Sequence, residues 1–141
     1  VKTNDGVDIV NNLTGKTIAI WGLSFKPETD DMREAPSVVI IKSLLEKGAI
    51  VNVYDPIAME EAKHSLGDTV KYCKDIYETL IGADALAVVT EWSEFRLPNF
   101  KVMEKLMNDK VLFDGRNIFD LEQIEEFGFK YFSIGRRPLN V

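Results

Sequence analysis

Short apolar runs alternate with longer amphipathic segments along the chain. The runs are rich in β-branched and aromatic residues and most stop at glycine, proline or aspartate, a pattern that predicts buried strands. We expect strands at residues 16–22, 50–54, 69–72, 84–90, 110–113 and 129–134. Between them, apolar residues fall on one helical face, as Val38, Ile41 and Leu45 do. We expect helices at residues 36–47, 58–66, 75–81, 100–107 and 121–127.

The order of these elements indicates an α/β fold. Strands alternate with helices, and the strands are apolar throughout, which is typical of a parallel sheet covered on both faces. We therefore expect a Rossmann-like, doubly wound parallel sheet in a three-layer α/β/α arrangement. Ligands of such sheets bind at the carboxyl ends of the strands, near the switch in strand order. A site is therefore expected in the loops after Gly22, Tyr54, Thr90 and Phe113.

Length and composition describe one ordinary globular domain. The chain has 141 residues, of which 45% are hydrophobic and 28% charged, enough to bury a core without a disulfide or a metal. Residues 1–14 are polar and predict a linker or lead-in, with the domain itself at residues 15–141. Because the first residue is Val1 and not Met, we expect a piece of a longer protein.

The charge balance disfavours two classes of partner. The formal net charge is -6, whereas nucleic acids and anionic membrane surfaces attract proteins with a positive field. No apolar run reaches the roughly 20 residues that a membrane helix needs. An anionic ligand must therefore be held by a local cluster of Lys and Arg.

Cysteine and histidine are too scarce for several kinds of site. Cys73 and His64 are the only residues of their kinds, so neither an internal disulfide nor a structural zinc site can form. Cys73 has no recognisable activating partner, and we expect it to be a small residue near the surface. His64 is expected to face solvent. A single cysteine fits a cytoplasmic protein.

The loop after the first strand carries the most information. Gly22 stands where a dinucleotide-binding domain begins its Gly-x-Gly-x-x-Gly fingerprint, but Ser24 and Pro27 replace the other glycines. Without them the backbone cannot approach a pyrophosphate closely, so NAD is not expected to bind here in the usual way. A purely structural glycine is the alternative. Lys26 and Arg33 can grip a phosphate, or they can belong to a solvated, salt-bridged loop.

Two later strand ends carry polar residues that allow more than one interpretation. Asp55 lies where a dinucleotide domain keeps its ribose-binding acid, but Asp55-Pro56 is also an ordinary turn signal, which is the interpretation we favour. Asp114-Gly115-Arg116 permits a sharp turn that directs the arginine toward the first loop. Two cationic loops from neighbouring strand ends would then form an anion site. An exposed arginine on a β-turn is the alternative.

Four segments, in order, resemble one known family. Gly22–Ser37, Thr90–Arg96, Phe113–Phe119 and Gly128–Arg136 are similar to successive signatures of the C-terminal UDP-binding domain of the UDP-glucose/GDP-mannose dehydrogenase family. The resemblance covers nearly the whole chain, and four ordered motifs are far more specific than any one of them. The stretch Thr-Glu-Trp-Ser-Glu-Phe-Arg looks most like the UDP-glucose 6-dehydrogenase branch.

The resemblance implies a larger enzyme. Its other parts are an N-terminal NAD-binding domain and a central dimerising helix, so the full enzyme is expected to be a homo-oligomer. It oxidises the C6 hydroxyl of UDP-glucose to a carboxylate with two NAD, through a cysteine thioester formed in a part that this chain lacks. We therefore expect the fragment alone to fold but to be inactive.

Site residues follow from the same resemblance, position by position. Phe25, Lys26 and Arg116 resemble substrate-binding residues, and Arg33 resembles an arginine that contacts NAD. No catalytic residue and no metal ligand is implied within this chain, and Cys73 does not correspond to the family's nucleophile.

Three other functions compete with this interpretation. A dehydrogenase of a UDP-N-acetyl sugar or of GDP-mannose would share the motifs, because most contacts that select the sugar lie in the missing domains. A free-standing nucleotide-binding module without chemistry is the second alternative. A phosphoacceptor receiver domain is excluded, because it needs acidic residues after the first strand, where this chain has Trp21-Gly22-Leu23-Ser24.

Overall fold

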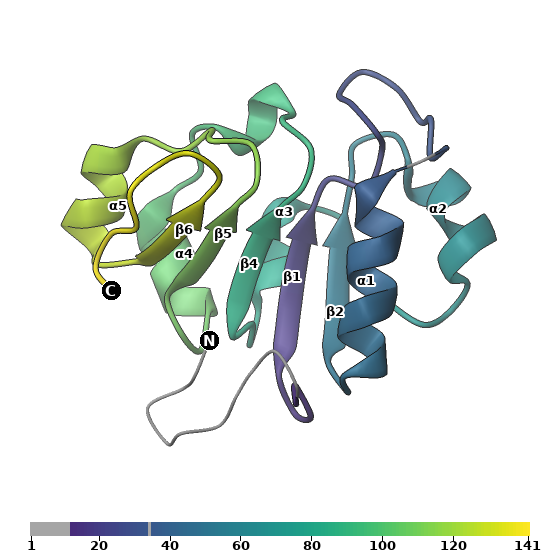
Figure 1. Cartoon of the computed structure of the whole chain (residues 1–141), viewed down its shortest axis with the longest axis horizontal. Coiled ribbons are helices and arrows are strands. Elements are labelled where there is room, and N and C mark those ends of the chain that lie inside the picture. Colours follow the sequence, from purple (N-terminus) through teal and green to yellow (C-terminus); the bar gives the residue numbers. More distant parts are fainter. Residues whose placement is uncertain (1–11, 34) are drawn as a thin grey trace.

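One six-stranded parallel sheet forms the centre of the protein (Figure 1). The computed structural model describes residues 12–33 and 35–141, so most of the expected linker at residues 1–14 lies outside the described residues. The strands are β1 (Thr17–Trp21), β2 (Ile50–Tyr54), β3 (Lys71–Tyr72), β4 (Ala85–Val88), β5 (Val111–Asp114) and β6 (Lys130–Ser133). Their order in the sheet is β3-β2-β1-β4-β5-β6, and every neighbouring pair is parallel.

Helices lie on both faces of this sheet. They are α1 (Pro36–Glu46), α2 (Met59–Leu66), α3 (Ile76–Leu80), α4 (Phe100–Leu106), α5 (Leu121–Phe127) and the short 3-10 helix η1 (Ser93–Phe95). The chain winds outward from β1 to β3, crosses back through α3, and winds outward again from β4 to β6. Right-handed crossovers therefore place α1 and α2 on one face and α3, α4 and α5 on the other. The predicted Rossmann-like, doubly wound class is confirmed.

Local sequence explains where the helices begin. Pro36 occupies the first turn of α1, where its missing N–H costs nothing. Asp75 caps α3, because its Oδ1 accepts the N–H of Glu78 at 2.8 Å. Asn99 caps α4 in the same way, accepting the N–H of Val102. Observed bounds agree with the expected ones to within one or two residues, and η1 is the element that the apolar pattern did not predict.

Each face of the sheet carries its own hydrophobic core. Aromatic residues fill the core beneath α3, α4 and α5, where the Trp21 and Phe95 rings lie 5.5 Å apart and Phe100 packs edge-on against Phe129. Aliphatic residues such as Ile20 and Ile41 fill the core beneath α1 and α2. Burial of each such side chain stabilises the fold by about 1.5–3 kcal/mol.

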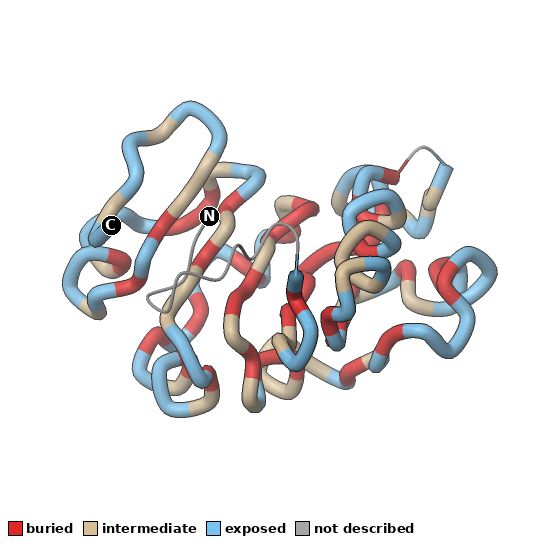
Figure 2. Tube along the Cα trace, turned by 60° about the horizontal axis from the view of Figure 1, so that its bottom comes forward, coloured by how far each residue is buried: buried red, intermediate tan, exposed pale blue. Residues whose placement is uncertain are grey.

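The described helices cover only half of the face that carries α1 and α2. In Figure 1 these two helices stand beside or in front of β1 and β2, while no described helix lies in front of β4 and β5. Burial along β5 consequently alternates: Leu112 and Asp114 are buried, but Val111 and Phe113 on the uncovered face are half-buried. Figure 2 shows the same mixture of buried and intermediate segments through the centre of the molecule, with exposed segments at its periphery. The expected helices on both faces are observed, and within residues 12–33 and 35–141 they cover one of the two faces only in part.

No described helix is long and apolar enough to cross a membrane.

Candidate functional site

Three loops at the carboxyl edge of the sheet carry the candidate site. They follow β1 (residues 22–35), β4 (residues 89–92) and β5 (residues 115–117), and they meet along the upper edge of the sheet in Figure 1. The sequence placed the first and third of these loops on neighbouring strands, and that was wrong. In the observed order β4 lies between β1 and β5, so the loop after β4 separates the two cationic loops and contacts both.

The loop after β4 is locked against the loop after β1. The Thr90 hydroxyl donates a 2.7 Å hydrogen bond to the main-chain carbonyl of Ser24. Gly22 makes this approach possible, because a Cβ at its position would lie 2.5 Å from Cβ of Thr90. Its φ of 94° is also one that other residues rarely adopt. Gly22 is therefore needed to accommodate a neighbouring loop.

Asp55 is a buried structural clamp at the end of β2. Its Oδ2 accepts the N–H groups of Leu23 and Ser24 at 2.8 and 3.2 Å. Its Oδ1 accepts those of Ile57 and Ala58 at 2.9 and 2.8 Å. Because both oxygens are occupied by main-chain donors in a fully buried position, Asp55 does not face a ribose. The interpretation of this residue as part of a turn is the one that the structure supports.

These two observations test whether the chain can cradle a dinucleotide. The glycine at the end of β1 is packed against Thr90, and the acid at the end of β2 is saturated by the main chain. The remaining fingerprint positions are Ser24, which is buried, and Pro27. The residues present therefore do not fit NAD in the manner of a dinucleotide-binding domain, despite the shared topology.

Phe25 and Lys26 lie at the exposed end of the first loop. Phe25 is 46% exposed although it is a large apolar residue, and Lys26 is exposed beside it. The loop is nevertheless shaped by internal bonds: the N–H of Phe25 donates to the carbonyl of Asp31 at 2.9 Å, and the Ser24 hydroxyl donates to the carbonyl of Lys26 at 2.8 Å. The tip thus presents an aromatic ring and a cation from an ordered backbone.

Arg33 is held by an acid of its own loop. Its Nε and Nη2 donate to the two carboxylate oxygens of Asp31 at 3.1 and 3.0 Å. These bonds, with a further one from the Arg33 main-chain N–H, lower the pKa of Asp31 to about 2. The Arg33 side chain is 90% exposed. In this structure Arg33 therefore belongs to a salt-bridged loop, with its guanidinium open to solvent.

Arg116 reaches from the loop after β5 onto the loop after β4. Its Nε donates to the Val89 carbonyl at 2.8 Å and lies 3.1 Å from Oε2 of Glu91. Its main-chain N–H donates to Asp114, whose side chain is buried. The two terminal NH2 groups of Arg116 have no hydrogen-bond partner among the described residues. A guanidinium fixed through Nε with free terminal groups is suited to a two-point contact with a phosphate.

Asp114 anchors the loop after β5 as Asp55 anchors the loop after β1. Its Oδ2 accepts the N–H of Ile118, the N–H of Phe119 and the Tyr131 hydroxyl at 2.9, 3.1 and 2.8 Å. Burial and the bond to Asp114 raise the pKa of Tyr131. Arg136 then donates to the carbonyls of Phe119 and Asn117. Sequence reasoning gave Asp114 only a place in a turn, and it gave no role to Arg136 or Glu91, whose partners lie elsewhere in the sequence.

The position expected for Cys73 was wrong. The residue is buried, with 1% of its surface exposed, because it directly follows β3 and continues the pairing with β2: its N–H donates to the Val53 carbonyl at 2.9 Å. Burial, followed by the nearby Glu78 carboxylate, raises its pKa to about 11. His64 is exposed on α2, as expected. Among the described residues, no group of three or more His, Cys, Asp or Glu side chains could hold a metal ion.

Sequence comparison identifies the family. Residues 19–121 match the UDP-glucose/GDP-mannose dehydrogenase family, UDP binding domain. The chain belongs to this family. It is 44% identical over 130 residues to UDP-glucose 6-dehydrogenase YwqF of Bacillus subtilis, an alignment that covers 92% of this chain and 30% of that protein. The chain thus spans less than a third of the length of this relative.

Solved structures show the same fold with different named substrates. The chain is 37% identical to a UDP-glucose dehydrogenase of Pyrobaculum islandicum, with a TM-score of 0.67. The alignment covers 76% of this chain and 23% of that one. It is 27% identical to an NDP-N-acetyl-D-galactosaminuronic acid dehydrogenase of Methanosarcina mazei, with a TM-score of 0.77, covering 89% and 26% of the two chains. The fold therefore does not by itself distinguish the sugars.

Proposed function

We propose that this chain binds the UDP part of UDP-glucose within a longer, NAD-dependent UDP-glucose 6-dehydrogenase. The observation that carries the proposal is the arrangement of Arg116, whose Nε donates to the Val89 carbonyl while its terminal NH2 groups have no hydrogen-bond partner among the described residues. The net charge of -6 disfavours non-specific attraction of a diphosphate. Such a ligand therefore needs a positively charged side chain held in place at the site, as Arg116 is.

Lys26 and Phe25 complete the proposed substrate surface. Lys26 supplies a movable point charge for the diphosphate, and the exposed Phe25 ring offers an apolar face beside it. Thr90 and Glu91 join this loop to Arg116, because one bonds Ser24 and the other pairs with the guanidinium. The three side chains thus stand on loops that are tied to one another.

We assign the redox chemistry to parts outside this chain. NAD would accept the hydrides, bound mainly by an N-terminal domain, and Arg33 would contact it across the cleft with its exposed guanidinium. The cysteine that forms the thioester lies outside this chain, because Cys73 is buried with a raised pKa. On this proposal Arg33→Ala in the full-length enzyme raises the KM for NAD more than the KM for UDP-glucose.

A second candidate is a dehydrogenase of UDP-N-acetyl sugars. It is favoured by the likeness to a UDP-D-ManNAc dehydrogenase of Pyrococcus horikoshii, which is 27% identical with a TM-score of 0.70. The higher identity to proteins named UDP-glucose 6-dehydrogenase favours UDP-glucose. Both candidates use the same diphosphate contacts.

A substrate panel separates them. The full-length protein is supplied with NAD and with UDP-glucose, UDP-N-acetylglucosamine, UDP-N-acetylmannosamine or GDP-mannose, and NADH absorbance is followed. The proposal expects the highest kcat/KM for UDP-glucose. Preference for an N-acetyl sugar establishes the second candidate, and reduction of NAD by this chain alone would contradict the placement of the catalytic parts elsewhere.

A further inference from the structure

The turn that carries Arg116 (residues 115–119) is held by two oppositely charged side chains. Asp114 accepts three of its main-chain N–H groups. Arg136, from the segment after β6, binds its carbonyls: Nη2 donates to Asn117 at 2.7 Å and Nη1 donates to Phe119 at 2.8 Å. One side chain thus fixes the donors of this turn and the other fixes its acceptors.

The backbone of this turn is one that needs such support. Asn117 directly follows Arg116 and has a left-handed φ of 57°. A residue other than glycine keeps this conformation only where its surroundings hold it. The bond from Arg136 fixes the Asn117 carbonyl, and with it the orientation of the next peptide plane. Since the backbone determines where the Arg116 side chain leaves the turn, loss of this bond is expected to redirect the guanidinium.

Tyr131 connects the acid to the base. Its side chain is fully buried, and its hydroxyl donates to Oδ2 of Asp114 at 2.8 Å and accepts from Nη1 of Arg136 at 3.1 Å. The buried Asp114 carboxylate therefore has a positive charge nearby, and a buried charge without compensation is costly. Arg136 also offsets a negative charge that would otherwise repel a diphosphate bound at Arg116.

The segment that supplies Arg136 is itself tied to the domain. The main chains of Tyr131 and Leu139 exchange two hydrogen bonds, at 3.0 and 3.1 Å, which close residues 132–138 into a loop. Asn140 continues this attachment, because its side-chain NH2 donates to the Phe129 carbonyl at 2.8 Å. Arg136 therefore reaches the turn from an anchored backbone.

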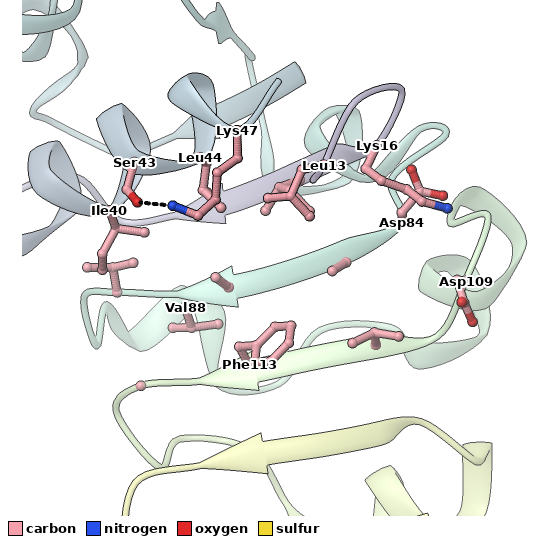
Figure 3. Close-up of a pocket in the computed structure, with 16 residues that line it drawn as sticks. Leu13, Lys16, Ile40, Ser43, Leu44, Lys47, Asp84, Val88, Asp109 and Phe113 are labelled. Atoms are coloured by element: carbon pink, nitrogen blue, oxygen red, sulfur yellow. Dashed lines mark hydrogen bonds between the residues drawn. The ribbon is translucent and has the colours of Figure 1, made fainter. Parts of the chain in front are cut away.

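The described residues of the open sheet face supply none of these anchors. An apolar groove of about 500 Å³ runs along that face, with Val88 and Phe113 toward the carboxyl ends of β4 and β5 (Figure 3). Its charged residues Lys16, Asp84 and Asp109 lie at the opposite end, where the strands begin (Figure 3). The turn therefore depends on Asp114 and on the segment after β6.

We infer that Arg136 is a positioning residue for the diphosphate of the nucleotide. It holds the turn so that the terminal NH2 groups of Arg116 are presented to the phosphates. Both of its own terminal nitrogens are already bonded to main-chain carbonyls, so it acts through Arg116 and not on the ligand. The inference rests on the proposed function, because it takes Arg116 to contact the diphosphate.

The first test is calorimetric titration of the full-length protein with UDP. We expect Arg136→Gln to raise the Kd about tenfold, the effect of one lost charge-assisted contact. Arg137→Gln is the matched control, because it removes the same charge from the next residue, which is exposed, and its Kd should stay within about twofold of the parent. Arg136→Lys should recover only part of the loss, since a lysine cannot bond two carbonyls in a fixed fork. An unchanged Kd for Arg136→Gln would overturn the inference.

A double variant shows whether Arg136 acts through Arg116. Once Arg116→Ala is present, adding Arg136→Gln should raise the Kd for UDP no further, because the group that it positions is gone. A further rise of the same size as in the parent would show an independent contact and overturn the inference. If Arg116→Ala raises the Kd and Arg136→Gln does not, the proposed function stands and this inference fails. If Arg116→Ala has no effect, both fail.

Steady-state kinetics separate positioning from a loss of folded protein. In Arg136→Gln the KM for the nucleotide sugar chosen by the substrate panel should rise, while kcat and the KM for NAD stay unchanged. Tyr131→Phe, which removes only the bridging hydroxyl, should raise the same KM to a smaller extent, so the test does not depend on one variant. A lower kcat with an unchanged KM in both variants, as partial unfolding produces, would overturn the inference.

Discussion

The Thr90 hydroxyl and the Ser24 carbonyl are joined by a 2.7 Å hydrogen bond that links the carboxyl ends of β4 and β1. Arg116 continues this link by bonding Val89, the residue before Thr90. The three loops of the candidate site are thus connected by main-chain acceptors in an unbroken series. A substitution that breaks one of these contacts is therefore expected to shift the other loops as well.

Gly22→Ala is expected to destabilise the fold strongly. The new Cβ would lie 2.5 Å from Cβ of Thr90, at a φ of 94°, and the combined overpacking and backbone strain should cost about 2–4 kcal/mol. Gly128→Ala is the matched control, because Gly128 is left-handed as well but its Cβ would meet nothing closer than 3.6 Å. That control should cost about 1 kcal/mol. Urea unfolding curves measure both, and equal losses would contradict the packing argument.

The substitution Asp55→Asn distinguishes a structural role of Asp55 from a role in binding ribose. In the asparagine variant an NH2 group replaces one carboxylate oxygen, so it faces main-chain N–H groups from which it cannot accept hydrogen bonds. The free energy of unfolding should therefore fall by about 1.5–3 kcal/mol. The KM of the full-length enzyme for NAD should stay unchanged, because the Asp55 carboxylate is buried and saturated. A raised KM for NAD with unchanged stability would restore the ribose interpretation.

Arg116→Ala is expected to weaken UDP binding to the full-length enzyme. Loss of a charge-assisted contact costs about 1.5–3 kcal/mol, which corresponds to a rise in Kd of about ten- to a hundredfold. Arg116→Lys should recover only part of this, since a lysine cannot bond the Val89 carbonyl and grip a phosphate at two points. Lys42→Ala, on the exposed side of α1, controls for lost charge. Calorimetric titration with UDP measures all three, and an unchanged Kd for Arg116→Ala contradicts the role.

Cys73 is expected to be unreactive and dispensable. Because its pKa is raised from 9.0 to about 11, burial of the neutral thiol favours the fold fully below pH 9, and this contribution is lost as pH rises toward about 11. At pH 8 a thiol reagent should modify the native chain far more slowly than the urea-unfolded chain. Cys73→Ala should leave kcat of the full-length enzyme unchanged, and a large loss of kcat without unfolding would show a catalytic role.

The apolar pattern was sufficient for the elements but not for their full arrangement. Parallel pairing and the Rossmann-like class followed from the apolar runs and their alternation with helices. The missing glycines at Ser24 and Pro27 predict an altered nucleotide site, which stays a prediction. The position of β4 between the two cationic loops could not be read this way, because strand order is set by crossovers and not by composition. Cys73 was misplaced because a two-residue strand gives too short a pattern to assign its faces.

Site residues differ in how well sequence alone identified them. Arg116 and Lys26 were predicted from charge at strand ends together with family signatures, and their roles stay predictions. Glu91 was missed because its partner Arg116 is far away in the sequence. Asp114 was interpreted only as part of a turn, although two of the N–H groups that it accepts, those of Ile118 and Phe119, are close by in the sequence. The pairing of Arg33 with Asp31 is local, and a salt-bridged loop was one of the two interpretations that the spacing allowed.

The two buried aspartates, Asp55 and Asp114, bind mainly main-chain N–H groups of the loops that they hold. Main-chain donors are the same whatever residue supplies them, so these clamps fix the paths of the loops without constraining most of the side chains along them. Substitutions at loop tips such as Phe25 can then accumulate during evolution while the scaffold stays intact. One fold can in this way come to serve enzymes named for different sugars, as the solved relatives do at 27% identity.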